Sequence, residues 1–329
     1  MVNPPQVIAI CSPGNLGKSL CDELLDDTRY KFFVISRQLE DGEVYVCDVT
    51  KLLFKSNRAA FFRDRNIDVR TSDYSLESVL EILNETNASV LVSFNNSGGQ
   101  TFVDVHCALL EACRKSLNCK RFIPSEFAGN IDEFPHYPSY YVHSRVPFRR
   151  ILEKEQQVEW TLFNPCWLMD YCLTADKSYM PSIPNEFPID PNGWKACIRG
   201  TGDAVQSFTS CRDVAKALIM LFDAPKWEPT IYVAGEWSTF NEMVLRMEKF
   251  HGRAMSKTYR SEEDIRRDTK LPHTPENSEK LYLASVEEMM ITAAGACPYD
   301  KTMRQREKFF QGLEFTTLEQ LLAQSKPLI

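Results

Sequence analysis

The feature that most constrains this chain is the alternation of short apolar runs with helix-length segments over its first half. This alternation predicts βαβ units that build a parallel sheet. Because crossovers between parallel strands are right-handed, helices should cover both faces of the sheet, and we predict a doubly wound α/β fold. The expected strands are Gln6–Ile10, Lys31–Ile35, Ile67–Ser72, Ser89–Ser93, Arg121–Ile123 and Trp160–Phe163, and the expected helices are Leu76–Glu85, Thr101–Ser116 and Arg145–Glu155.

The pattern changes after about residue 165, where several prolines interrupt the chain. We expect residues 1–165 to form the sheet domain and residues 166–329 to form a smaller, mostly helical lobe. A helix is predicted over Asp213–Asp223 and a strand over residues 230–234. Residues 205–235 are expected to return to the sheet.

The stretch 38–66 places five cations among three phenylalanines. The cations are Lys51, Lys55, Arg58, Arg63 and Arg65, and the aromatic residues are Phe54, Phe61 and Phe62. One interpretation is a cation patch near a phosphate. The other, which we favour, is an amphipathic helix with a solvated face.

Charge and hydropathy exclude several classes of function. The 329 residues carry 38 Lys and Arg against 45 Asp and Glu, a net charge of −7. An acidic chain lacks the cation excess that phosphate contacts need, so no nucleic-acid partner is expected. No apolar run approaches the roughly 18–20 residues that span a bilayer, and the first residues lack a signal-peptide pattern. We therefore expect a cytoplasmic protein, a monomer or homodimer, with no membrane partner.

The cysteines fit that expectation. There are 11 of them, without a short repeating spacing, which is not a disulfide framework. The sequence has neither a C-x-x-C pair nor an H-E-x-x-H helix, so no metal site is expected. Most of the thiols should act as small apolar core groups.

A glycine-rich turn, Cys11-x-x-Gly14-x-x-Gly17, follows the first expected strand. Backbone N–H groups and the positive end of a helix dipole make such a turn a phosphate site. Two ligands compete for it. The run from Ser12 to Ser19 misses only the first glycine of the nucleoside-triphosphate loop G-x-x-x-x-G-K-[ST]. A dinucleotide loop instead uses its glycines for a tight turn and for close approach of the backbone.

Arg37 favours the dinucleotide. It lies roughly 20 residues past Gly17, at the end of the second expected strand, where a dinucleotide's ribose is recognised. An acidic residue there would bind a free 2′-OH, whereas arginine suits a 2′-phosphate through charge-assisted hydrogen bonds. The sequence therefore favours NADPH over a nucleoside triphosphate.

Several blocks in one order resemble a known family. They are Ile8–Gly17, Arg37, Asp73-Tyr74, Arg121–Phe127 with its Pro-Ser-Glu-Phe, Glu159–Pro165 and Trp167–Tyr171. Together they resemble the NmrA-like, isoflavone-reductase-like branch of the atypical short-chain dehydrogenases, from residue 6 to the tail that begins at Glu314. The resemblance implies a Rossmann-type domain that binds NADPH and a C-terminal lobe over the nicotinamide. Relatives include plant phenylpropanoid reductases, fungal secondary-metabolite reductases and regulators that bind the dinucleotide without turnover.

The resemblance and the topology of open α/β sheets indicate the same site residues, because ligands bind beyond the carboxyl ends of the strands. The residues expected to contact the cofactor are Cys11, Ser12, Gly14, Asn15, Leu16, Gly17, Arg37, Phe94, Asn95, Asn96, Ser125 and Asn164. The residues expected to line a pocket for a hydrophobic substrate are Trp167, Met169 and Tyr171. The same aromatic and methionine side chains also fit a plain core.

Two positions depart from the family pattern. The first loop residue is usually glycine and here is Cys11; if it needs a positive φ, a Cβ costs on the order of 1–2 kcal/mol. The reductases also carry a lysine just before the Arg-Arg of the helix after Pro-Ser-Glu-Phe, and here that position is Arg145. Because arginine stays protonated, we expect Arg145 to anchor a hydroxyl or polarise a carbonyl rather than donate a proton.

Two neighbours of Arg145 are the candidate proton donors. Tyr141 precedes it by four positions, so on a helix the two share a face and the cation would lower the tyrosine's pKa. His143 is the other candidate, since an ordinary histidine pKa of about 6.5 suits acid–base chemistry. Packing for Tyr141 and a surface or capping position for His143 are the plainer interpretations.

We therefore expect an NADPH-dependent oxidoreductase that reduces a C=O, C=C or C=N bond of a hydrophobic small molecule, in secondary metabolism. An iminium substrate is compatible with Arg145, because a carbon already polarised for hydride needs no lysine acid. One alternative is a non-redox cyclase or isomerase that shapes a reactive intermediate on the same fold. Another is a regulatory protein that senses NADP(H) without turnover, and a nucleotide hydrolase ranks last.

Overall fold

The computed structural model describes residues 6–37, 44–46, 53–55, 58–183 and 185–327. The chain forms two compact units. The first unit is drawn from residues 1–126, 141–163 and 221–230, and the second from residues 127–140, 164–220 and 231–329.

A parallel sheet forms the centre of the first unit. Among the described residues it has six strands in the order β5-β2-β1-β6-β7-β8. The strands are β1 (Gln6–Cys11), β2 (Tyr30–Ser36), β5 (Val69–Thr71), β6 (Val90–Ser93), β7 (Arg121–Ile123) and β8 (Glu159–Trp160). The strand order reverses between β1 and β6, which is where sheets of this kind bind their ligands.

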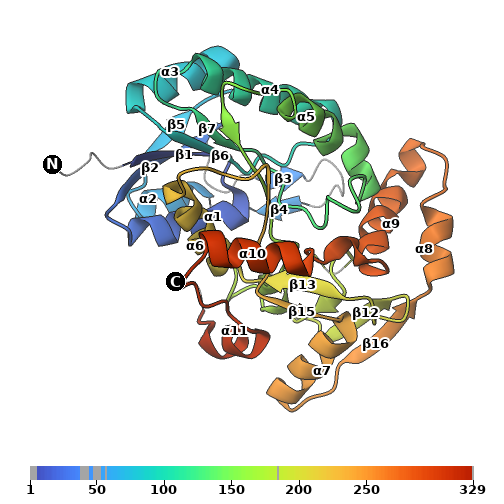
Figure 1. Cartoon of the computed structure of the whole chain (residues 1–329). Helices are drawn as coiled ribbons and strands as arrows, with labels where there is room; N and C mark the ends of the chain where they lie inside the picture. Colours follow the sequence, from blue (N-terminus) through green and yellow to red (C-terminus); the bar gives the residue numbers. More distant parts are fainter. Residues whose placement is uncertain (1–5, 38–43, 47–52, 56–57, 184, 328–329) are drawn as a thin grey trace. The chain divides into compact units, whose positions relative to one another are not determined.

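Helices cover both faces of this sheet. In Figure 1, α3, α4 and α5 lie along one face and α1 and α2 along the other. Their bounds are α1 (Gly14–Leu25), α2 (Arg58–Asp64), α3 (Leu76–Thr86), α4 (Gly99–Lys115) and α5 (Arg145–Leu152). The ends of α3 follow the sequence closely: the Ser75 hydroxyl accepts from the Ser78 N–H, and Asn87 ends the helix with a φ of 54°. The predicted doubly wound, Rossmann-type fold is confirmed.

The second unit combines helices with two three-stranded sheets among the described residues. One sheet contains β10 (Trp167–Leu168), β13 (Gln206–Thr209) and β15 (Glu236–Ser238), and the other contains β11 (Ile189–Asp190), β12 (Lys195–Arg199) and β16 (Ser256–Arg260). The helices are α7 (Phe240–His251), α8 (Glu262–Asp268), α9 (Ser278–Met290), α10 (Tyr299–Phe309) and α11 (Leu318–Gln324). Nowhere in the described segments is a helix both long and apolar enough to cross a membrane.

The segment 205–235 was expected to return to the large sheet; its strands pair elsewhere, although residues 221–230 belong to the same unit as that sheet. After helix α6 (Cys211–Asp223), strand β14 (Thr230–Tyr232) pairs with β9 (Leu162–Asn164), while β13 pairs with β10 and β15. All four residues of β13 are buried, so this strand needs partners on both edges, and it finds them in the smaller sheet. The expected strand Trp160–Phe163 is accordingly divided between β8 and β9.

The stretch 38–66 is not one amphipathic helix. Its described parts are an antiparallel pair, β3 (Val44–Val46) with β4 (Leu53–Lys55), and the short helix α2. Arg65 forms an ion pair with Asp22 at 2.8 Å, and its guanidinium carbon lies 4.0 Å from the centre of the Phe61 ring. Packing and pairing within the unit thus explain this cation, whereas Lys51 lies outside the described residues.

A buried ion pair joins the end of β7 to α5. Arg149 Nε donates to Glu126 Oε2 at 3.2 Å, and Arg149 Nη2 donates to Oε1 of the same carboxylate. The two residues are only 8% and 4% exposed. This bidentate pairing gives a structural role to Glu126 of Pro-Ser-Glu-Phe and to Arg149 of the next helix.

Arg149→Met should reduce the free energy of unfolding by about 3–5 kcal/mol, because it leaves the Glu126 carboxylate buried without its counter-ion. Lys115→Met is the control, since the exposed Lys115–Glu111 pair at 3.5 Å should contribute less than about 0.5 kcal/mol. Urea unfolding followed by circular dichroism measures both. Equal losses in the two variants would contradict this account.

Candidate functional site

The glycine-rich turn lies at the switch point of the sheet. The last residue of β1, Cys11, is in register with Ile35 on one side and Ser93 on the other. Helix α1 begins three residues later, and the first N–H groups of a helix have no intrahelical acceptor. Gly14, Asn15 and Leu16 therefore present backbone donors beyond the end of β1, as a phosphate site requires.

Gly17 permits a close approach between α1 and the segment after β6. A Cβ at this position would lie 2.5 Å from Pro13 Cβ and 3.3 Å from the Phe94 ring. The first distance is a steric clash, and the second is a tight contact. This is the close packing that the last glycine of a dinucleotide fingerprint provides.

Cys11 does not adopt the positive φ that would make its Cβ costly. Cys11 is an ordinary strand residue, and the positive φ angles of the turn belong to Ser12 (51°) and Gly14 (54°). Burial raises the pKa of the Cys11 thiol to about 12, so it stays protonated and packs as an apolar group. Replacement of the family's glycine by Cys11 therefore leaves the turn intact.

Arg37 follows β2 and is exposed beside this turn. Its backbone N–H donates to the Tyr74 hydroxyl at 3.3 Å, and its guanidinium carbon lies 5.9 Å from the centre of the Tyr74 ring. The described residues provide no carboxylate for the Arg37 side chain. Tyr74 thereby links the end of β2 to the segment after β5.

A hydrogen-bonded histidine connects the ends of β6 and β7. His106 has no exposed surface; its Nδ1 lies 2.8 Å from the Phe102 carbonyl oxygen, and its Nε2 accepts from the Ser125 N–H at 3.2 Å. The Ser93 hydroxyl lies 3.2 Å from the same Nε2 and accepts from the Asn95 N–H at 3.3 Å. These contacts fix the backbone of two residues that the sequence places at the cofactor.

The same contacts determine the charge of His106. Because the Ser125 N–H can only donate, Nε2 must be unprotonated, and Nδ1 carries the proton that it donates to Phe102. Burial, together with the nearby Arg145 cation, lowers the pKa of His106 from its ordinary 6.5 to about 3. His106 is therefore a neutral positioning residue for this strand edge.

Arg145 begins α5 and is only 3% exposed. Its guanidinium carbon lies 4.1 Å from the centre of the Phe102 ring and 4.5 Å from that of Tyr141, and Nη2 donates to Asn96 Oδ1 at 2.5 Å. Nε has no hydrogen-bond partner, and the described residues provide no carboxylate. The site thus holds a buried guanidinium that its surroundings only partly compensate.

The two proton-donor candidates are placed differently. Tyr141 belongs to a short 3-10 helix, Ser139–His143, and Ser144 separates it from α5, so Tyr141 and Arg145 do not lie on one α-helix. The tyrosine still contacts Arg145, but through the face of its ring. His143 is exposed at the end of the 3-10 helix. Both assignments as proton donors stay predictions.

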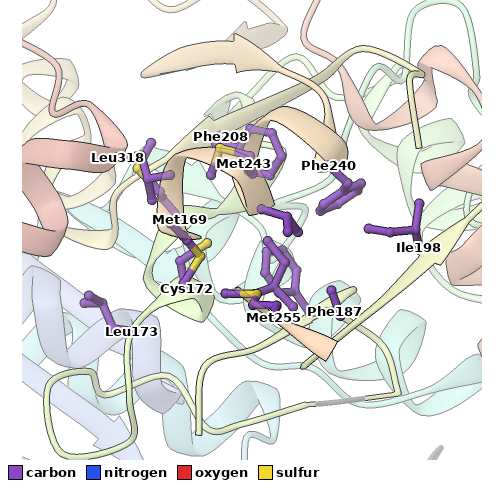
Figure 2. Close-up of a cluster of buried hydrophobic side chains, with 14 of the residues drawn as sticks. Met169, Cys172, Leu173, Phe187, Ile198, Phe208, Phe240, Met243, Met255 and Leu318 are labelled. Carbon is purple, nitrogen blue, oxygen red and sulfur yellow. The ribbon is translucent and has the colours of Figure 1, made fainter. Parts of the chain in front are cut away.

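The remaining candidates lie in the second unit. Asn164 is fully buried, and its Oδ1 accepts from the Ala128 N–H at 3.1 Å. Met169 has no exposed surface and lies within a core cluster, which Figure 2 shows. This methionine is therefore a core residue rather than part of a pocket wall. Trp167 and Tyr171 are half-buried beside the same cluster and stay the predicted substrate contacts.

Within the first unit, the structure gathers the turn, Arg37, Phe94, Asn95, Asn96, Ser125 and Arg145 along the carboxyl edge of the sheet. Sequence reasoning missed Tyr74, Ser93 and His106 as members of this site. Tyr74 did stand in one of the blocks that carry the family resemblance, but His106 and Ser93 look like ordinary helix and strand residues. No group of His, Cys, Asp and Glu side chains suited to a metal ion occurs in the described parts of the chain.

The His106 pKa predicts how stability depends on pH. Because the folded-state pKa lies below the unfolded value, the neutral histidine stabilises the fold above about pH 6.5, and this contribution is lost as the pH falls toward 3. The loss should reach about 1.4 kcal/mol for each pH unit. Asp170, whose pKa burial raises to about 6, changes stability in the opposite direction over the same range.

Comparison with His106→Gln therefore isolates the histidine, since glutamine keeps a neutral donor and acceptor and does not titrate. Urea unfolding from pH 7 to pH 4 should show the wild-type stability falling more steeply than that of the variant. Parallel curves would mean that His106 does not stay neutral in the folded protein.

Comparison with known proteins gives the same fold and a family. The sequence model of the NmrA-like family matches residues 5–322. Oxidoreductase swnR of Arthroderma benhamiae is 30% identical over 319 residues, covering 96% of each chain, and oxidoreductase swnR of Metarhizium robertsii is 30% identical over 320 residues with the same coverage.

Among solved structures, isoflavone reductase superposes with a TM-score of 0.71 at 18% identity, covering 98% of this chain and 99% of the other. The leucoanthocyanidin reductase–NADPH complex from Vitis vinifera superposes with a TM-score of 0.69 at 16% identity, covering 96% and 98%. These structures share the fold described above. With a family match over nearly its whole length and relatives named as oxidoreductases, this chain belongs to the NmrA-like family.

Proposed function

We propose that this protein is an NADPH-dependent reductase of a hydrophobic small molecule. The observation that carries the proposal is the exposed Arg37, without a carboxylate partner among the described residues, at the end of β2 beside a glycine-rich turn. The relatives named as oxidoreductases and the NADPH complex of a leucoanthocyanidin reductase on the same fold support it.

The residues of the first unit suit each part of the cofactor. The N–H groups at the start of α1 would bind the pyrophosphate, and Arg37 would bind the 2′-phosphate. Asn95 and Ser125, fixed through Ser93 and His106, would contact the ribose. Bound NADPH would supply the hydride, and Trp167 and Tyr171 are the proposed contacts for a flat, apolar substrate.

Arg37→Ala should weaken NADPH binding by about 10- to 100-fold and leave NADH binding unchanged, because only NADPH carries the 2′-phosphate. Titration followed by tryptophan fluorescence measures both affinities. Arg29→Ala is the control, since Arg29 is equally exposed but lies before β2 and pairs with Asp27 and Asp223. Equal losses for both cofactors, or no binding of either by the wild type, would contradict the proposal.

Arg145 suggests which bond is reduced. Its guanidinium stays charged at every accessible pH, so it orients or polarises a substrate but cannot donate the proton that a ketone's oxygen needs after hydride transfer. An iminium carbon is already activated, and its reduction gives an amine without a further acid. We therefore propose C=N reduction, because this reaction needs no proton from residue 145 after hydride transfer.

A matched pair of probes tests this choice: 3,4-dihydroisoquinoline, a cyclic imine, and 1-tetralone, the ketone of the same shape. The wild type should reduce the imine at least about tenfold more efficiently in kcat/KM. Arg145→Lys introduces a residue that can donate a proton, so it should raise ketone reduction at least about tenfold while changing imine reduction less. NADPH consumption at 340 nm measures both reactions.

Asn96→Ala is the matched control, because it removes the hydrogen bond to the Arg145 side chain without supplying an acid. It should not raise ketone reduction. Efficient ketone reduction by the wild type would contradict the assignment of the bond, but it would leave the assignment as a reductase intact.

A further inference from the structure

Two thiols of the second unit are in direct contact. Cys166 follows β9 and Cys297 precedes α10, and their Sγ atoms lie 3.1 Å apart although 131 positions separate them in the chain. A disulfide needs a separation of about 2.05 Å, so a shift of about 1 Å would join them. Contact alone does not make a reactive pair, and the surroundings decide whether the shift is feasible.

The backbone on both sides of the pair is held in place. The Cys166 N–H donates to the Ala128 carbonyl at 3.0 Å, the Cys297 N–H donates to Ser207 Oγ at 2.9 Å, and Trp237 Nε1 donates to the Cys297 carbonyl at 2.9 Å. Near Cys297, a Cβ at Gly295 would collide with the Gln206 side chain. Because both cysteines are anchored, the sulfurs stay face to face rather than sampling other partners.

The two residues differ in exposure. Cys166 is half-buried, whereas Cys297 is 2% exposed. Burial raises the pKa of the Cys166 thiol well above its ordinary value, so little of it is thiolate at neutral pH. A small oxidant should therefore react with Cys166 first, and faster as the pH rises.

We propose that Cys166 and Cys297 are a redox modification site that a peroxide converts to a disulfide. The Cys166 thiolate attacks one peroxide oxygen, the O–O bond breaks, and the products are a sulfenic acid at Cys166 and, after proton uptake, water. The Cys297 thiol then attacks the Cys166 sulfur, the S–O bond breaks, and a second water leaves with the thiol proton. Two thiols lose two electrons and two protons, and one peroxide becomes two waters.

The consequence is local. The disulfide would tie the segment that carries Trp167 to the segment before α10, and Trp167 already donates to Gln206 Oε1 at 2.8 Å beside Ser207. Oxidation would thereby fix the strand that presents a proposed substrate contact. This inference does not depend on the cofactor or on the proposed reaction.

A second thiol pair in the chain provides an internal comparison. Cys113 and Cys119 lie 3.8 Å apart in the first unit and have no exposed surface. The greater distance and complete burial predict that this pair resists a peroxide under conditions that oxidise Cys166 and Cys297.

Peptide mapping of the full chain tests the proposal. The protein is treated with hydrogen peroxide at pH 8, blocked with N-ethylmaleimide and digested with trypsin without reductant. We expect a peptide 155–177 joined to a peptide 281–301, two hydrogens lighter than their sum and separated by dithiothreitol. Oxidised protein should also melt at least about 5 °C above the reduced form, since the cross-link closes a long loop.

Cys172 lies in the same tryptic peptide as Cys166, so Cys172→Ser is the matched control. It should keep the cross-link, whereas Cys166→Ser and Cys297→Ser should abolish both the cross-link and the rise in melting temperature. If peroxide leaves both peptides alkylated in the wild type, or joins Cys113 to Cys119 instead, the proposal is wrong. The wild-type map decides this even if a variant fails to fold.

Discussion

The contact on which the candidate site depends is the approach of α1 to the segment after β6 at Gly17. A single added Cβ there would meet both Pro13 and the Phe94 ring. Because interiors are close-packed, relief of that clash would shift Pro13, which caps α1, and with it the first N–H donors of the helix. Phe94 is followed in the chain by Asn95, whose N–H donates to the Ser93 hydroxyl. The phosphate end and the ribose end of the proposed site therefore share one packing constraint.

Three arginines of the first unit differ in burial and in partners, although their side chains are chemically the same. Arg37 is exposed, whereas Arg149 is buried and neutralised by Glu126. Arg145 is buried and stacked on aromatic rings, with no carboxylate among the described residues. Burial of a charge is costly unless it is paired, so only Arg149 has a purely structural explanation. Arg37 and Arg145 are the two to which we assign roles in the proposed reaction.

The sequence predicts the sheet well because each parallel strand carries its own apolar run and turn. It also places the glycine turn and Arg37, since both follow from position in the first βα unit. Prediction from the sequence fails where contacts between distant residues determine the structure. Nothing local in Gln206–Thr209 distinguishes a strand of the large sheet from one of the smaller sheet, and nothing in the spacing of Tyr141 and Arg145 shows the break at Ser144. His106 escapes notice because its role comes from backbone groups that meet only in the fold.

Arg145 and His106 both contact the Phe102 ring. The Phe102 and His106 rings are stacked, with 3.9 Å between their centres. The centre of the Phe102 ring also lies 4.1 Å from the Arg145 guanidinium carbon. Burial is the main cause that disfavours protonation of His106, and the Arg145 cation adds to it, so Nε2 stays an acceptor for the Ser125 N–H. A lysine could lose its proton on burial, and this restraint on His106 would weaken when it did. Arginine at this position therefore removes a proton donor and adds a charge that helps burial to keep His106 neutral.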